Sequence, residues 1–259
     1  MNFVNKMEKE YKNIENANIN EAMVLLKNDT KLEIKNVICF YVGENKVKSY
    51  DEWIKPQMVE NTMELLTQEL PKLKSKIQIL HLCFTTDPFM YGHKEINELS
   101  AQIIQKANSE GVRCSVLTKG ILPESLAEFP LDNEYGITVV SLDDKFVEKY
   151  EPGAANITDR INALRVLHNT GCKTWVSIEP YPTPNMINQN LERILETVSF
   201  VDKIIFGRLH YNKTVSEYKD YKEFYNDCAR TVINFCNERD IAYHIKKGTI
   251  SGDKQEETK

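Results

Sequence analysis

The sequence lacks an apolar run long enough to cross a membrane, because none of its hydrophobic stretches reaches the ~18 residues of a spanning helix. Its first ten residues lack the apolar core of a secretory signal peptide. It also lacks any Cys-x-x-Cys pair, and its 6 cysteines are spread along the chain, which is typical of reduced thiols rather than of disulfides. These absences predict a cytoplasmic protein without a membrane segment.

A strong excess of charge is missing as well. The chain has 33 Lys and Arg against 38 Asp and Glu, a formal net charge of -5, and the two signs are interspersed. Nucleic-acid-binding domains show a basic patch or stripe, so the charge gives no support for a nucleic acid partner. The length of 259 residues suits a single α/β barrel with a sizeable core.

Strand-like and helix-like patterns alternate along most of the chain, separated by short loops. This alternation predicts a parallel sheet with helices on its outer face. We expect a leader and first strand over 1–30, a barrel over 31–246 and a disordered tail over 247–259. The predicted strands are 22–27, 78–89, 112–118, 136–142, 173–179, 203–209 and 241–246, and the predicted helices are 56–70, 93–109, 123–129, 157–168, 188–199 and 220–238.

The faces of the strands favour a barrel over a doubly wound sheet. In the stretch 78–89, His81, Cys83, Thr85 and Asp87 share one face, because strand side chains alternate. A doubly wound sheet would be rich in Val and Ile on both faces. The pattern therefore predicts a partial (β/α)6 TIM-like barrel with a polar interior. Further residues expected on the inner face are Trp175, Ser177, Glu179, Arg208, His210, His244 and Lys246.

Charged and hydroxyl side chains mark the carboxyl ends of the predicted strands, which meet at one mouth in a parallel barrel. The mixture of signs suits a small zwitterionic ligand, with Lys119 for a carboxylate and Asp87 or Glu179 for an ammonium or ribose hydroxyls. A charge network that neutralises itself is the alternative. The strand-end set is Asp87, Lys119, Ser141, Glu179, Arg208 and His210.

Six phrases in a fixed order carry a resemblance to a known family. They are F-T-T-D-P-F, V-L-T-K-G, S-L-D-D, K-Y-E-P-G-A, N-A-L-R-V-L-H-N-T-G and W-V-S-I-E-P-Y-P-T-P. Together, from about residue 36 to 210, they resemble the spore photoproduct lyase-like branch of the radical S-adenosylmethionine superfamily. The resemblance implies an enzyme whose partial barrel binds S-adenosylmethionine. It implies that Lys119 and Ser141 contact the methionine end, with Thr85, Thr86 and Asp87 lining the pocket.

The same family carries a Cys-x-x-x-Cys-x-x-Cys loop after its first strand, whose thiolates hold a 4Fe-4S cluster. The cluster delivers the electron that cleaves the cofactor, so a reductase or a flavodoxin- or ferredoxin-type donor is the implied partner. In register, Cys39 fills the third position, but Leu32 and Asn36 fill the other two. Iron–sulfur clusters need thiolates, so Cys39 is the one predicted metal ligand, with His81 and Cys83 as distant helpers.

Two alternatives remain open at this stage. A zinc site from His81, Cys83, His210 and His244 has suitable ligand types but no closely spaced pair. The second alternative is a cluster-less module that binds S-adenosylmethionine, a nucleotide or a protein without radical chemistry. The residues Leu32 and Asn36 separate that module from a radical enzyme, whereas the substrate and the catalytic residues are not indicated.

Overall fold

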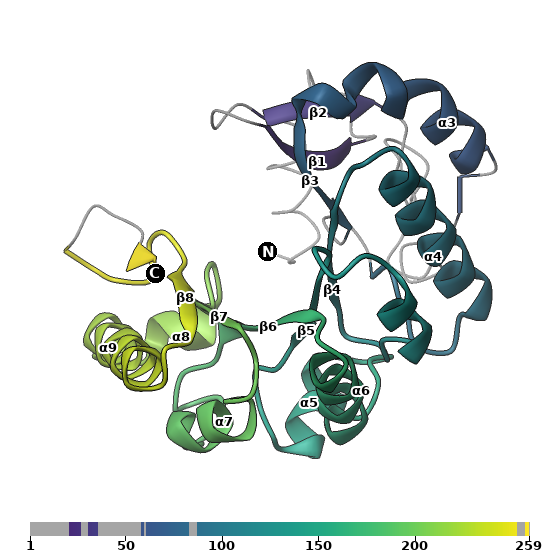
Figure 1. Cartoon of the computed structure of the whole chain (residues 1–259). Helices are drawn as coiled ribbons and strands as arrows, with labels where there is room; N and C mark the ends of the chain where they lie inside the picture. Colours follow the sequence, from purple (N-terminus) through teal and green to yellow (C-terminus); the bar gives the residue numbers. More distant parts are fainter. Residues whose placement is uncertain are drawn as a thin grey trace. The chain divides into compact units, whose positions relative to one another are not determined.

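The computed structural model describes residues 21–26, 31–35, 58–59, 61–82, 87–252 and 257–258. The chain forms two compact units (Figure 1). The first unit comprises residues 1–88 and 95–115, and the second comprises residues 89–94 and 116–259. Over the described ranges, no helix has the length and apolar character that a membrane span requires.

The first unit contains three strands of a nine-stranded sheet and two helices. Strand β1 (Glu21–Leu26) pairs antiparallel with β2 (Lys31–Lys35) and with β3 (Ile77–Leu82). The predicted first strand is therefore confirmed as a strand, but the prediction that the sheet is parallel is wrong for it. The physical reason is the short connection of residues 27–30, because a parallel neighbour needs a crossover of a dozen or more residues.

Helices α3 (Thr62–Leu73) and α4 (Lys94–Ser109) complete the first unit. Their apolar stripes bury Leu66, Leu70, Ile96 and Ile103, each at most 1% exposed. Removing this apolar surface from water is the main term that stabilises the unit. The end of α4 leads into β4 (Cys114–Thr118), whose last three residues belong to the second unit.

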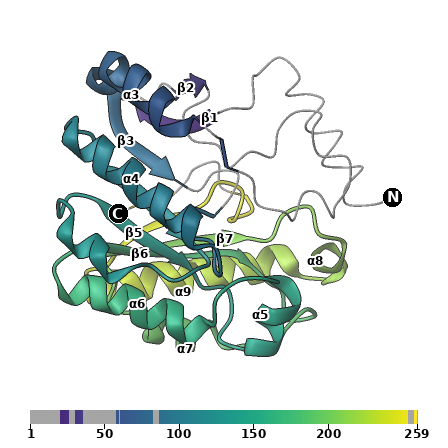
Figure 2. The same ribbon diagram turned by 90° about the vertical axis from the view of Figure 1, so that its right-hand side faces the viewer.

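The second unit continues the strand–helix alternation. Neighbouring strands from β5 to β8 pair in parallel, and α6, α7 and α9 cover one face of these strands (Figures 1 and 2). The elements are the 3-10 turn η2 (Glu124–Glu128), β5 (Glu134–Thr138), α5 (Asp144–Tyr150), α6 (Ile157–Asn169), β6 (Lys173–Tyr181), α7 (Leu191–Thr197), β7 (Lys203–Arg208), α8 (Lys213–Glu217), α9 (Tyr221–Arg239), β8 (Ala242–Ile245) and β9 (Glu257–Thr258).

The predicted fold class, a partial (β/α)6 TIM-like barrel, is confirmed. Its six parallel strands are β3 to β8, and consecutive strands are neighbours in the sheet order. Two short helices, α5 and α8, were absent from the sequence prediction. Each begins at a side-chain cap: Asp143 Oδ1 accepts from the Phe146 amide, and Asn212 Oδ1 accepts from the Val215 amide.

Strand β6 shows how the barrel opens at its carboxyl end. Along its middle, Trp175 and Ser177 are 5% and 4% exposed, and Val176 and Ile178 are fully buried. Both faces of this stretch are therefore closed to solvent. Exposure rises at Glu179, whose side chain is 26% exposed. The solvent-accessible part of β6 at its carboxyl end therefore begins at Glu179.

Candidate functional site

Three of the predicted site residues lie at carboxyl ends of strands in the second unit. Lys119 directly follows β4, Ser141 follows β5, and Glu179 lies near the end of β6. The Lys119 side chain is 39% exposed, whereas Ser141 is fully buried. Parallel strands bring these ends to one edge, which is where barrel enzymes hold their ligands.

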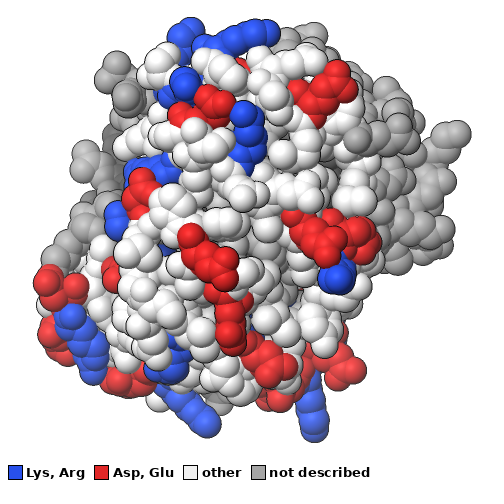
Figure 3. Space-filling view, turned by 45° about the vertical axis from the view of Figure 1, so that its right-hand side comes forward, with Lys and Arg blue, Asp and Glu red and all other residues white. Residues whose placement is uncertain are grey.

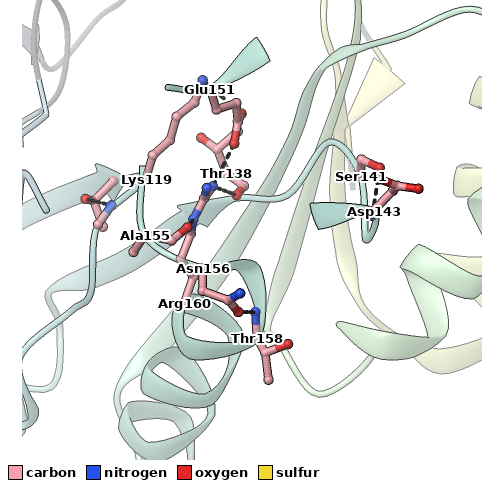
Figure 4. Close-up of polar contacts among 11 residues, drawn as sticks. Lys119, Thr138, Ser141, Asp143, Glu151, Ala155, Asn156, Thr158 and Arg160 are labelled. Atoms are coloured by element: carbon pink, nitrogen blue, oxygen red, sulfur yellow. Dashed lines mark hydrogen bonds and ion pairs between the residues drawn. The ribbon is translucent and has the colours of Figure 1, made fainter. Parts of the chain in front are cut away.

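Lys119 belongs to a buried ion-pair cluster with Glu151 and Arg160 (Figure 4). Its Nζ lies 3.0 Å from Glu151 Oε1, and Arg160 Nη1 lies 2.9 Å from Glu151 Oε2. The side chains of Glu151 and Arg160 are only 3% and 0% exposed. One carboxylate therefore contacts two cations.

Arg160 is fixed in place by backbone carbonyls as well as by Glu151. Its Nε donates to Ala155 O at 2.8 Å and its Nη1 donates to Thr138 O at 3.1 Å. Its Nη2 is buried without a hydrogen-bond partner among the described residues. Arg160 thus connects α6 to the end of β5, and through Glu151 it holds the Lys119 ammonium at the end of β4 (Figure 4).

Ser141 lies away from this cluster (Figure 4). Its Oγ accepts a hydrogen bond from the Asp143 amide at 3.1 Å, and Asp143 is the N-cap residue of α5. The hydroxyl therefore shapes the turn between β5 and α5. Asp143 in turn caps α5, so Ser141 and Asp143 form one turn structure.

Glu179 belongs to a second charged group at the ends of β6, β7 and β8. Its Oε2 lies 3.2 Å from Lys246 Nζ. The carboxylate packs over Gly207, where an added Cβ would come within 2.8 Å of Glu179 Cδ. Beside it, Arg208 Nε donates to His210 Nδ1 at 3.2 Å. We call Glu179, Arg208, His210 and Lys246 the β6–β8 charged group.

The pKa of His210 is lowered from its ordinary value. Burial is the largest cause, because it disfavours the charged imidazolium, and the neighbouring Arg208 guanidinium acts in the same direction. The Glu179 carboxylate opposes them. His210 is therefore held as a neutral imidazole over more of the acidic pH range than a free histidine.

Several predicted site residues lie outside the described residues: Thr85, Thr86, Cys39, Cys83 and Asn36. Asp87 is described and is partly exposed, but it belongs to the first unit. Its predicted convergence with the strand ends of the second unit stays a prediction.

The position predicted for the first cluster ligand differs from expectation. Leu32 lies within β2, where it pairs with Val24 of β1, and not in a loop. The expectation of a continuous loop after the first strand is therefore wrong for this part. The hairpin pairing accounts for the difference, because the chain reverses into a second strand directly after β1.

The structure offers no metal centre among the residues it describes, where no group of three or more His, Cys, Asp or Glu side chains converges. Four of the cysteines, Cys114, Cys172, Cys228 and Cys236, are described, and all are buried. Burial raises the pKa of the Cys228 thiol to about 12, so that side chain is not a ready thiolate.

Sequence reasoning missed Glu151 and Arg160 as site residues. Arg160 had a signal, because it falls on the apolar stripe of α6 between Ile157 and Leu164, both of which are buried. A charged residue on such a stripe is buried only when it is paired. Glu151 stood in one of the phrases that carried the family resemblance, yet its partners come from a strand end and a helix that only the fold brings together.

No protein-family model matches the chain. Among curated proteins, the chain is 23% identical over 176 residues to the uncharacterized protein ORF301 of Acidianus two-tailed virus. The match covers 64% of this chain and 56% of the viral protein, so the chain spans about half the length of this relative.

Two enzymes among the solved structures have a similar fold. Spore photoproduct lyase with bound AdoMet and dinucleoside spore photoproduct matches with a TM-score of 0.53 and 14% identity, over 76% of this chain and 70% of the lyase. Streptococcus suis SuiB bound to precursor peptide SuiA matches with a TM-score of 0.52 and 12% identity, over 93% of this chain and 53% of SuiB. The chain has their fold.

Surface charge gives no large field of one sign on the face that Figure 3 draws. Lys and Arg side chains alternate there with Asp and Glu side chains over the described surface. Electrostatic steering of a long polyanion needs a continuous basic stripe.

Proposed function

We propose that this chain binds S-adenosylmethionine at the carboxyl ends of its barrel strands. The observation that carries the proposal is the cluster of Lys119, Glu151 and Arg160, which presents a partly exposed ammonium held in place by a buried ion pair. The fold shared with a lyase whose structure contains AdoMet supports the choice of ligand.

The ligand and the strand ends match in charge. S-adenosylmethionine carries a carboxylate, an ammonium, a sulfonium and ribose hydroxyls. Lys119 provides a cation for the carboxylate, and the Glu179 carboxylate can accept from the ammonium or from the ribose. Ser141 is assigned to the same ligand by family resemblance, as are Asp87, Thr85 and Thr86.

The residues present do not fit a 4Fe-4S cluster. Of the three positions that would supply thiolates, only Cys39 is a cysteine, whereas Asn36 is a poor ligand and Leu32 is none. Leu32 also lies in a strand. We therefore derive no reductive cleavage for this chain, and a cluster-less S-adenosylmethionine-binding module is the form of the proposal that its residues favour.

Replacing Lys119 with alanine should weaken S-adenosylmethionine binding by about 1.5–3 kcal/mol, the usual range for a hydrogen bond to a charged group. Isothermal titration calorimetry on the full chain measures this difference. Lys145→Ala is the matched control, because Lys145 is an exposed lysine on α5 and its loss changes the net charge equally. Absence of binding to the unmodified chain, or equal affinity in both variants, would refute the proposal.

Anaerobic reconstitution with iron and sulfide should load far less than one 4Fe-4S cluster per chain, because one thiolate cannot hold four irons. Iron and sulfide assays together with EPR of the reduced protein measure the loading. Stoichiometric iron in the unmodified chain would contradict this expectation and would identify Cys83 as the first residue to substitute. S-adenosylmethionine binding is measured separately, so a cluster-free protein can still confirm or refute the cofactor proposal.

A further inference from the structure

The β6–β8 charged group has donor atoms that the fold itself does not use. The Arg208 Nε donates a hydrogen bond to His210 Nδ1, and the Arg208 backbone amide donates one to Thr249 Oγ1. The two Nη groups of Arg208 have no partner among the described residues. Lys246 Nζ contacts only Glu179 there, which leaves further N–H groups available on the ammonium.

The contact with Arg208 fixes the tautomer of His210. Because the Arg208 Nε–H donates to Nδ1, that ring nitrogen is an acceptor and carries no proton. The proton of the neutral ring is therefore on Nε2. His210 presents an N–H donor at the end of β7, beside the Arg208 guanidinium.

Packing holds these donors at the strand ends. An added Cβ on Gly248 would lie 3.4 Å from His210 Cε1, so the imidazole lies against the loop after β8. Thr249 in that loop is fully buried and accepts from the Arg208 amide at 3.3 Å. On the other side, the Leu209 amide donates to Tyr225 Oη at 3.3 Å, and Tyr225 Oη donates to Tyr181 O at 2.7 Å.

The backbone next to His210 is in an uncommon conformation. Tyr211 has φ 55, in the left-handed region, and its side chain is 75% exposed. The other described non-glycine residue with positive φ, Asp240, is the C-cap of α9, where this conformation is usual. Tyr211 is not a helix cap. A left-handed backbone at a tyrosine costs free energy, and it persists only where the surrounding structure holds the loop in one conformation.

We infer that Arg208, His210 and Lys246 form a binding site for an oxyanion, a phosphate or a carboxylate, at the ends of β7 and β8. The group has two cations and one carboxylate, so one positive charge is in excess. Arg208 offers paired N–H groups suited to the planar geometry of two oxygens, His210 offers Nε2–H, and Lys246 is oriented by Glu179. The lowered pKa of His210 keeps that ring in its neutral donor form.

We assign the oxyanion to the substrate rather than to S-adenosylmethionine. This part of the inference rests on the proposed function, whereas oxyanion binding itself does not. The carboxylate of the cofactor is assigned to Lys119 at the end of β4, which pairs with Glu151 and Arg160 and not with the β6–β8 charged group. Oxyanion binding itself can therefore be tested without cofactor.

The test uses the full chain with 13C-labelled histidine and follows the five histidine Cε1–H signals by NMR during addition of inorganic phosphate. The pH is fixed, and chloride keeps the ionic strength constant. The His210 signal is assigned by its loss in His210→Gln. We expect it to move saturably, while acetate in a parallel titration shows whether a carboxylate binds better than phosphate.

Arg208→Gln should weaken the apparent phosphate affinity by about tenfold or more, because it removes the paired charged donors. Lys213→Gln is the matched control, since Lys213 lies on the neighbouring helix α8 with a 91% exposed side chain. Glu179→Gln should strengthen phosphate binding, because it removes the one negative charge of the group. Unchanged signals of the other histidines show that each variant is folded.

Two results would overturn the inference. One is a His210 signal that does not respond saturably to either phosphate or acetate. The other is an equal loss of affinity in Arg208→Gln and Lys213→Gln, which would indicate general charge screening. If Arg208→Gln loses phosphate binding but keeps its affinity for S-adenosylmethionine, the result supports two separate subsites. If the chain binds phosphate but not S-adenosylmethionine, the proposed function fails and the oxyanion site is still supported.

Discussion

Replacing Arg160 with methionine should lower the free energy of unfolding of the second unit by about 3–5 kcal/mol, the cost of removing one partner from a buried ion pair. Arg160 is fully buried, and it donates to Glu151, Ala155 O and Thr138 O. Its loss leaves the Glu151 carboxylate at 3% exposure with Lys119 as its remaining cation. Desolvation of a half-paired carboxylate is the source of the penalty.

Urea unfolding followed by tryptophan fluorescence measures this change. The chain has 2 tryptophans, so a Trp53→Phe background makes Trp175 of β6 the only reporter and restricts the signal to the second unit. Arg165→Met on the same helix is the control, because Arg165 is exposed, lies over the Phe200 ring and should lose about 1 kcal/mol at most.

A double variant separates the ion pair from simple loss of packing. With both Arg160→Met and Glu151→Met, no buried charge remains in the pair, and much of the lost stability should return. A single Arg160→Met variant as stable as Arg165→Met would contradict the prediction. The prediction would also be contradicted if the double variant had a lower free energy of unfolding than Arg160→Met alone, as expected when each substitution only leaves a cavity.

The alternation of strand and helix was readable from the sequence because hydrophobic periodicity differs between the two. Strand 173–179 was predicted and is observed as Lys173–Tyr181. The direction of a strand leaves no such periodic trace. The strand Glu21–Leu26 was therefore located correctly but placed in a parallel sheet, whereas it pairs antiparallel on both sides.

The site was readable only in part, for a related reason. Lys119 and Glu179 could be placed at strand ends, because the end of an apolar run marks a position along the chain. Their pairings could not be found this way. Glu151 follows a helix that was not predicted, and Lys246 was expected on the inner face without any pairing to Glu179. Pairing between distant segments depends on register, which single-residue patterns do not encode.

The surroundings of two glycines, Gly207 and Gly120, also could not be predicted from the sequence, because residues distant in the chain form them. An added Cβ on Gly207 would meet the flexible end of the Glu179 side chain, at 2.8–2.9 Å. An added Cβ on Gly120 would lie 1.7 Å from the carbonyl oxygen of Phe89, which is backbone. A side-chain end can rotate away from a new methyl group, but a buried backbone carbonyl cannot. The two glycines therefore differ in the cost of the same substitution.

Gly120→Ala should accordingly destabilise the second unit by about 3 kcal/mol, the upper part of the range for overpacking. The clash also reaches the site. Gly120 donates its amide to Thr118 Oγ1 at 2.8 Å, and Lys119 lies between these two residues. A shift of this turn displaces the Lys119 ammonium from Glu151, so S-adenosylmethionine affinity should fall about as far as in Lys119→Ala.

Urea unfolding and calorimetry on Gly120→Ala and Gly207→Ala measure the two effects. We expect Gly207→Ala to lose less than about 1 kcal/mol of stability, as a change relieved by side-chain rotation should. Its effect should appear instead in phosphate affinity, because it moves Glu179 and with it Lys246. Equal stability of the two variants would show that the Phe89 backbone yields to the methyl group, and the tight turn would then not be what holds Lys119 in place.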